Sequence, residues 1–306
     1  MTTIEHEVTS TVEGSSSISL PSWTISAMLR PISNAQELSV IQDSLNGLPM
    51  PEMLFGTNSL VISNKIMTFE YTFNALGALG PVKLGELEHG DGGVKVGYAK
   101  EWLQSRTGSA SANPMPPTVQ AKPFDWTFTT TYPGHISKGE FKFNPGDPEN
   151  VLHRIPTEEL SRPDPILFYS EIPLFEDELH DNGCAFLLTR VRVMPTSFFI
   201  LSRFFLRVDG VLFRLFDTRI YHSFASSPPI IVRETNGWEA PYASVKQFLP
   251  TPDLSPLNDP NFVAKVITSM PKSKTQDPRL PGLSGWRALG TTLEVCYLDR
   301  DPLQHS

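Results

Sequence analysis

The sequence predicts an α+β protein, predominantly antiparallel β-sheet and sandwich-like, with a few short helices and long loops. Strand-like segments follow one another instead of alternating with long helices, which argues against a doubly wound parallel sheet. The densest run of Val, Ile, Phe and Tyr, residues 191–222, is interrupted once, by the hairpin signal Asp209-Gly210. The 28 prolines among 306 residues imply many loops, and a hydrophobic content of 40% suffices for a globular core.

The composition narrows the class of protein. A formal net charge of −8 and a pI near 5.4 argue against nucleic acid as the main partner. Two cysteines, Cys184 and Cys296, cannot build a disulfide framework or a thiolate zinc site, and Cys184 is expected to be a small buried hydrophobe. No apolar run approaches the length of a membrane span, and the polar N-terminus lacks the layout of a signal peptide. We therefore expect a soluble, intracellular protein.

The N-terminal part divides into a tail and the start of a single β-rich domain. Residues 1–20 are polar and expected to be disordered, and the domain is expected to span residues 21–270. Ser33 or Asn34 is placed to cap a short helix, which Gly47 ends. Alternation of apolar and polar residues predicts strands at residues 23–32, 59–63 and 66–74.

The middle of the chain is expected to be rich in loops. Residues 80–93 are a glycine-rich loop, and residues 107–121 are a linker-like insertion by composition. Around them the sequence predicts a short helix at 100–106 and strands at 94–99, 124–132 and 139–144.

The C-terminal half contains the strongest strand signals. Strands at residues 166–169 and 184–194 precede the hairpin. After His222 the chain is expected to be mostly irregular, with helical periodicity at 244–248 and 260–269. Residues 271–306 are expected to form an irregular or partly disordered extension with one strand candidate at 292–298.

A two-residue turn at Asp209-Gly210 would set the register of the hairpin. One face would then pair Phe204 with Leu215, and further from the turn Ser202 with Asp217 and Ile200 with Arg219. Asp217 and Arg219 are two residues apart on one strand and point the same way, beside apolar side chains. Charge next to exposed apolar surface is typical of a recognition patch.

The opposite face of the hairpin would carry three arginines among aromatic residues. Arg203 would lie against Phe216, Phe205 against Arg214, and Arg207 beside Leu212. A cation–π contact is one interpretation. The simpler one, which we favour, is that the arginine stems cover the outer face of a half-buried sheet.

Two further functions remain open from the residues alone. A metal-dependent hydrolase would use the acidic segment Glu176, Asp177, Glu178, His180 and Asp181, although this segment lacks the spacing of known cation loops and more often forms a solvated turn. A single-stranded nucleic-acid binder would use the aromatic and arginine side chains of the hairpin, but the chain has no basic stripe.

Six segments carry a resemblance to a known family. They are LPMPEMLFG (48–56), EWLQSR (101–106), DWTFTT (125–130), LFEDELHDNG (174–183), RVMPTSFF (192–199) and RFFLRVDGVLFRLFDTRIYH (203–222). In this order and spacing they closely resemble the Tip-forty-one-like (TIPRL) family of TOR signalling pathway regulators, with the look of a fungal-type member. The likeness runs from about Trp23 to His222 and is nearly continuous over residues 174–222.

The resemblance implies a regulatory protein and not an enzyme, with no cofactor. Members bind and inhibit or restrain catalytic subunits of type-2A serine/threonine protein phosphatases and act in TOR signalling. An alpha-four-type phosphatase-associated protein is a further implied partner, and neither nucleic acid nor membrane is. The implied location is the cytoplasm, with the nucleus as a second compartment.

The family's contact positions fall on particular residues of this chain. The resemblance assigns partner binding to Ile155, Leu215 and Asp217, with Arg219 as a neighbour. Another family contact, an aspartate, falls on Gly77, so this polar contact is expected to be absent or relocated here. Leu215 stands where the animal pattern has Met, a change that conserves volume.

Overall fold

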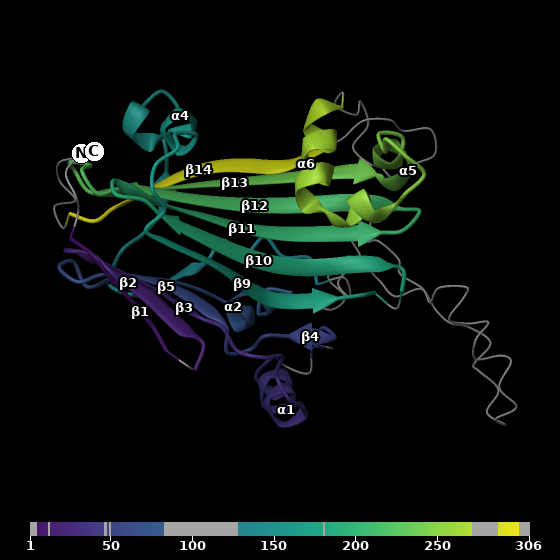
Figure 1. Ribbon diagram of the computed structural model, residues 1–306, viewed down its shortest axis with the longest axis horizontal. Coiled ribbons are helices and arrows are strands. Elements are labelled where there is room, and N and C mark those ends of the chain that lie inside the picture. Colours follow the sequence, from purple (N-terminus) through teal and green to yellow (C-terminus); the bar gives the residue numbers. More distant parts are fainter. Residues whose placement is uncertain are drawn as a thin grey trace, which may run out of the picture.

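The computed structural model describes residues 5–11, 13–45, 48, 50–82, 128–179, 181–270 and 287–299. Two antiparallel sheets make up most of this part, with short helices around them, so the predicted α+β class is confirmed (Figure 1). The strands pair mostly with their sequence neighbours, which explains why strand signals arrive in runs along the chain.

The smaller sheet is formed by the N-terminal third of the chain and one later strand. Its order is β1-β2-β3-β5-β6-β7. The strands are β1 Glu7–Ser10, β2 Ser15–Ser19, β3 Trp23–Met28, β5 Ser59–Asn64, β6 Phe69–Asn74 and β7 His135–Lys138. Burial alternates along β3 and β5, as expected for strands with one face toward a core.

The larger sheet has eight strands in the order β4-β9-β10-β11-β12-β13-β14-β8. They are β4 Met53–Leu54, β8 Asn144–Pro145, β9 Phe168–Asp177, β10 Gly183–Val193, β11 Ser197–Val208, β12 Leu212–Ser223, β13 Ile230–Pro241 and β14 Arg287–Tyr297. The hairpin β11–β12 therefore lies at the centre of this sheet and not at an edge.

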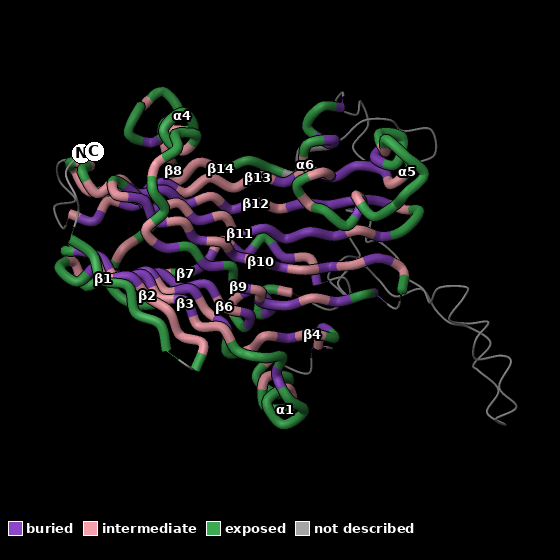
Figure 2. Tube along the Cα trace, in the orientation of Figure 1, coloured by how far each residue is buried: buried purple, intermediate pink, exposed green. Residues whose placement is uncertain are grey.

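The main hydrophobic core fills the space between the two sheets. On β11 the even-numbered residues face it, including Phe198, Ile200 and Phe204, each at most 1% exposed. Ile25 and Phe73 of the smaller sheet pack into the same cluster. Figure 2 shows the inner strands largely buried and the outer ends of the helices and turns exposed. The face of the larger sheet that points away from this core is called the outer face below.

The helices lie at the periphery of the sheets. Helix α1, Ala35–Ser44, begins with a capping box. The side chain of Asn34 accepts backbone N–H groups of the first turn, and the carboxylate of Glu37 accepts the backbone N–H of Asn34, so the predicted cap is confirmed. The others are α2 Ala75–Leu79, α4 Thr157–Leu160, α5 Tyr242–Lys246, α6 Pro260–Ser269 and the 3₁₀ turns η3 Val151–His153 and η4 Ser255–Asn258. The helical periods predicted near α5 and α6 are thereby confirmed.

Both flanks of the expected domain differ from prediction. The polar tail contains β1 and β2, and Ile18 is fully buried, because β2 pairs with β3 along its whole length. The C-terminal extension contributes β14, which pairs with β13 over most of its length. Strand β13 lies in a region that was expected to be irregular. It forms a strand because its polar sequence finds partners across the sheet.

The register of the hairpin is one residue away from the prediction. The loop has three residues, because Val208 pairs with Leu212 while Gly210 adopts a left-handed φ of 72° and the N–H of Val211 donates to the carbonyl of Val208 at 3.0 Å. Arg203 consequently lies opposite Asp217 and not opposite Phe216. A shift of one residue changes which side chains become neighbours across the whole hairpin.

Residues 83–127 lie outside the described residues, so the predictions made for them are not tested. These predictions are most of the loop at 80–93, the strand at 94–99, the helix at 100–106, the insertion at 107–121 and the start of the strand at 124–132. Residues 128–132 form no strand, and in place of the strand predicted at 139–144 the structure has β7 at His135–Lys138. Strand β9 is much longer than the predicted strand at 166–169.

Candidate functional site

The outer face of the larger sheet carries charged and apolar side chains in its middle and is covered at both ends. Odd-numbered residues of β11 and β12 point to this face, together with their partners on β10, β13 and β14. We call its middle the central strip, which consists of Leu188, Arg190, Leu201, Arg203, Asp217, Arg219, Glu234 and Asn236. Six of these eight residues are partly exposed, and Arg203 and Asp217 are buried.

Helices α5 and α6 with the turn η4 cover one end of the outer face (Figure 1). Val263 and Ile267 of α6 pack on Phe205, Phe213 and Leu215 of the sheet, and all of them are fully buried. The predicted apolar period of residues 260–269 therefore serves to dock this helix.

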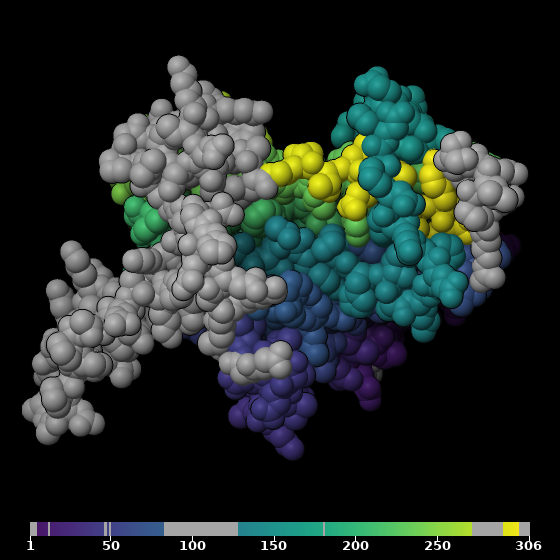
Figure 3. Space-filling model, turned by 180° about the vertical axis from the view of Figure 1, so that it is seen from behind, coloured from purple at the N-terminus to yellow at the C-terminus, as the bar shows by residue number. Residues whose placement is uncertain are grey.

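The segment η3–α4 covers the other end of the same face. Ile155, which lies between the two helical turns, packs with Tyr221, Val232 and Val295 and is 8% exposed. Leu152 on η3 remains 46% exposed at the rim. Seen from behind, the teal lobe that holds this segment rises above the yellow strand β14, beside a hollow (Figure 3).

A buried ion pair lies at the border between the central strip and α6. Arg203 Nε donates to Asp217 Oδ1 at 2.6 Å and Nη2 to Oδ2 at 2.7 Å, a bidentate geometry. The Asp217 side chain is 0% exposed and that of Arg203 is 10% exposed. Arg203 Nη1 also donates to Asn261 Oδ1 at 3.0 Å, so the pair connects two strands to α6.

Arg219 is the more accessible cation beside this pair. Its side chain is 33% exposed, and its Nη2 approaches Asp217 Oδ2 at 3.5 Å. Glu234 lies opposite it on β13, and Arg190 forms an ion pair with Glu171 at 2.9 Å on the far side of the strip. The strip thus alternates positive and negative groups, which suits a polypeptide partner better than a nucleic-acid backbone.

The structure places all four positions assigned by the resemblance on or beside the outer face. Ile155 lies in one cover, Leu215 under the other, and Asp217 and Arg219 between them. The expectation that Leu215 and Asp217 are exposed is wrong, because α6 covers Leu215 completely and Arg203 encloses the carboxylate of Asp217. In the chain by itself, only Arg219 of the four offers substantial surface.

The arginines interpreted as surface cover are, for the most part, buried. Besides Arg203, Arg214 turns to the inner face and pairs with Glu239, whose side chain is 0% exposed. Arg207 keeps 16% of its side chain exposed and pairs with Asp209 at 2.9 Å. No local sequence signal distinguishes these cases, because the hairpin register sets the Arg203–Asp217 pair and the pairing of β12 with β13 sets the Arg214–Glu239 pair.

Gly77 shows why an aspartate is absent at its position. A Cβ at this residue would lie 2.6 Å from the hydroxyl oxygen of Tyr132. That hydroxyl donates to the carbonyl of Thr72 at 3.1 Å and lies 2.8 Å from His135 Nδ1, so the tyrosine occupies the space with its own polar network. Burial raises the pKa of Tyr132, which keeps the hydroxyl protonated.

The described residues of the acidic segment lie at the end of β9 and in the turn that follows it. Asp177 ends β9 and accepts the N–H of Leu179 at 2.7 Å and that of Glu52 at 3.1 Å. Burial raises the pKa of Asp177 to about 6. Among the described residues no three His, Cys, Asp or Glu side chains are placed to hold a metal, and His180 is outside them. Within the same part of the chain, no helix is long and apolar enough to cross a membrane.

Comparisons with known proteins agree with the resemblance. The model of the TIP41-like family matches residues 53–246, from β4 to α5. The chain is 38% identical over 244 residues to a Saccharomyces cerevisiae protein named "Type 2A phosphatase activator TIP41", covering 76% of this chain and 65% of that relative. It is 36% identical over 245 residues to the TIP41-like protein of Homo sapiens, covering 80% and 83% of the two chains.

A second fungal relative completes this picture. The Schizosaccharomyces pombe "Type 2A phosphatase activator tip41" is 33% identical over 201 residues, which cover 65% of this chain and 73% of the relative. The family match includes the strands that form the central strip and the cover that holds Ile155. The chain belongs to the TIP41-like family.

Proposed function

We propose that this protein is a regulatory protein, and not an enzyme, that binds catalytic subunits of type-2A serine/threonine phosphatases. Membership of the TIP41-like family supports the proposal, as do the two fungal relatives whose names describe type 2A phosphatase activators. The observation that carries it is the outer face, where four positions of one family contact set gather from η3–α4 and β12.

The structure suggests a different task for each of these residues. Arg219 would contact the partner directly, because a third of its side chain is exposed beside a buried carboxylate. Asp217 would orient Arg219 and hold Arg203 against α6, and therefore act through its neighbours. Ile155 and Leu215 would keep the two covers in place on either side of the central strip. Arginine is among the residues that are enriched in protein interfaces.

The direct test measures the affinity of the protein for a purified type-2A catalytic subunit. We expect Arg219→Glu to weaken binding at least tenfold, about 1.4 kcal/mol, because it reverses the accessible charge of the strip. Arg30→Glu is the matched control, since Arg30 is 40% exposed and also pairs with a carboxylate, but lies just beyond strand β3 of the smaller sheet. Undiminished binding by Arg219→Glu, with a normal melting curve, would exclude the central strip as the surface that binds the phosphatase.

The direction of regulation is a separate measurement. The resemblance implies restraint of the phosphatase, whereas both fungal relatives carry "activator" in their names. Hydrolysis of a phosphopeptide by the catalytic subunit, with and without saturating amounts of this protein, gives the sign. We propose restraint, and a rise in the rate would contradict it.

We also propose the finer expectations of the resemblance as part of this function. These are a role in TOR signalling, association with an alpha-four-type phosphatase-associated protein, and a cytoplasmic and nuclear location. Affinity capture with mass spectrometry tests the second partner, and imaging of a tagged chain tests the location.

A further inference from the structure

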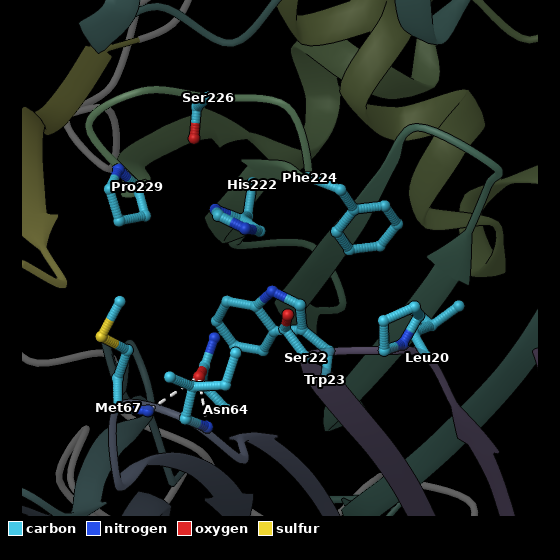
Figure 4. Close-up of a pocket in the computed structure, with 11 residues that line it drawn as sticks. Leu20, Ser22, Trp23, Asn64, Met67, His222, Phe224, Ser226 and Pro229 are labelled. Carbon is cyan, nitrogen blue, oxygen red and sulfur yellow. Dashed lines mark hydrogen bonds between the residues drawn. The ribbon is translucent and has the colours of Figure 1, made fainter. Parts of the chain in front are cut away.

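A cavity of about 300 Å³ lies at one end of the sandwich, away from the outer face. Three chain reversals form it: the β2–β3 turn, the β5–β6 turn and the connection from β12 to β13. Its side chains include Trp23, Asn64, Met67, His222, Phe224 and Pro229. In Figure 4 the indole of Trp23 lies beneath the imidazole of His222, with Phe224 on one side and Met67 and Pro229 on the other. We call this cavity the turn pocket.

The walls of the turn pocket are apolar and uncharged. No lysine, arginine, aspartate or glutamate lies among the described residues that line it. His222 is neutral at physiological pH, because burial lowers its pKa to about 4. An anion or a cation would therefore enter the pocket without a counter-charge, which is strongly unfavourable.

Two polar atoms on buried side chains of the turn pocket lack a hydrogen-bond partner within the described part of the chain, and neither is among its fully enclosed unpaired atoms. Trp23 and His222 are each 3% exposed. His222 Nδ1 donates to the carbonyl of Ile230 at 2.7 Å, so in the neutral ring Nε2 is left as an acceptor. The indole Nε1–H of Trp23 makes no hydrogen bond to described residues. A donor and an acceptor on these two otherwise buried side chains therefore remain open to water or to a ligand.

Two other polar side-chain atoms of the turn pocket are already engaged. Asn64 Oδ1 accepts the backbone N–H groups of Ile66 and Met67 at 3.0 and 2.9 Å, drawn as dashed lines in Figure 4. Ser226 Oγ donates to the carbonyl of Ser223 at 3.0 Å. The pocket thus offers the Trp23 donor and the His222 acceptor within a largely apolar wall, beside the hydroxyl of Ser22 and the amide nitrogen of Asn64.

We propose that the turn pocket is a second binding site, which takes one apolar residue of an extended, uncharged segment of a partner polypeptide. The carbonyl of that residue accepts from Trp23 Nε1, and its N–H donates to His222 Nε2. A backbone amide is the common group that supplies both an acceptor and a donor. A volume near 300 Å³ lies at the small end of ligand pockets and suits one or two residues. Ile66 at the mouth is 70% exposed and extends the apolar contact along a passing chain.

Titration of the ¹⁵N-labelled full chain with N-acetyl-leucinamide tests the proposal by NMR. The indole N–H signal of Trp23, assigned by its loss in Trp23→Phe, is expected to shift in a saturable way. N-acetyl-leucine, the matched carboxylate, is expected to bind at least tenfold more weakly at pH 7, because no cation lines the pocket. The His222 ring signals give a second readout that needs no substitution.

Substitution at the mouth separates this site from nonspecific binding. Ile66→Ala is expected to weaken the response of Trp23 at least twofold, whereas Val40→Ala, an equally exposed apolar position on α1, is expected to leave it unchanged. No saturable shift at Trp23 and His222, an equal response to the carboxylate, or insensitivity to Ile66→Ala overturns the proposal. Binding of the phosphatase at the central strip is independent of these outcomes.

Discussion

Removal of the charge on Asp217 is expected to destabilise the fold strongly. Asp217→Asn leaves the guanidinium of Arg203 10% exposed and without its bidentate partner, while the bond from Arg203 to Asn261 still holds it against α6. Breaking one side of a buried ion pair costs about 3–5 kcal/mol, because the remaining charge stays desolvated. A midpoint shift in urea-induced unfolding measures this loss of stability.

Two controls separate this effect from a general sensitivity to charge. Glu171→Gln breaks the more exposed pair with Arg190, where the side chains are 44% and 26% exposed, and is expected to cost less than about 1 kcal/mol. Asp217→Leu combined with Arg203→Met removes both charges and is expected to recover stability relative to either single change. A loss below about 1 kcal/mol for Asp217→Asn would refute the reasoning.

Three further predictions concern packing and pH. Leu215→Ala is expected to cost about 2–5 kcal/mol in urea unfolding, because its side chain is fully buried under α6, and a loss under about 1 kcal/mol would show that α6 is not tightly docked. Gly77→Ala is expected to lower the free energy of unfolding by about 1–3 kcal/mol, because the new Cβ would meet Tyr132, and an unchanged melting temperature would contradict this. The native pKa of His222 is lowered to about 4 from 6.5, so its contribution to the free energy of unfolding is fully present above pH 6.5. About 3 kcal/mol of that stability is lost as the pH falls to 4. The pKa of Asp177 is raised to about 6 from 3.8, so this group acts in the opposite sense and stabilises the fold most below pH 3.8. The contribution of His222 is therefore measured as the difference between wild type and His222→Phe in how the free energy of unfolding changes with pH.

The fold class and the hairpin were predictable because they follow from local patterns. Alternating burial and the turn residues at Asp209-Gly210 indicate antiparallel strands without knowledge of their neighbours. Strand β13 was not predictable in this way, since Arg233 and Glu234 read as loop residues. In the structure Arg233 pairs with Glu294 at 2.9 Å and lies 3.8 Å above the ring of Phe143, contacts from distant parts of the chain.

The position of the candidate site was predictable from the sequence, but the burial of its residues was not. Spacing on one strand correctly put Leu215, Asp217 and Arg219 on the same face, and the resemblance added Ile155. The length of the turn changed the partner of Arg203, and the docking of α6 buried Leu215. Neither effect leaves a signal in a short window of sequence, because both depend on which element packs on the sheet. The turn pocket was not predictable for the same reason, because its residues come from three separate chain reversals.

The central claim is that the partner binds the outer face between α6 and η3–α4. Photo-crosslinking from a single benzoylphenylalanine tests it most directly, with the probe at Asn236 in the central strip or at Val61 on the smaller sheet, both partly exposed positions. Crosslinking to the type-2A catalytic subunit is expected from position 236, and none is expected from position 61. Crosslinking from position 61 without any from position 236 would contradict it.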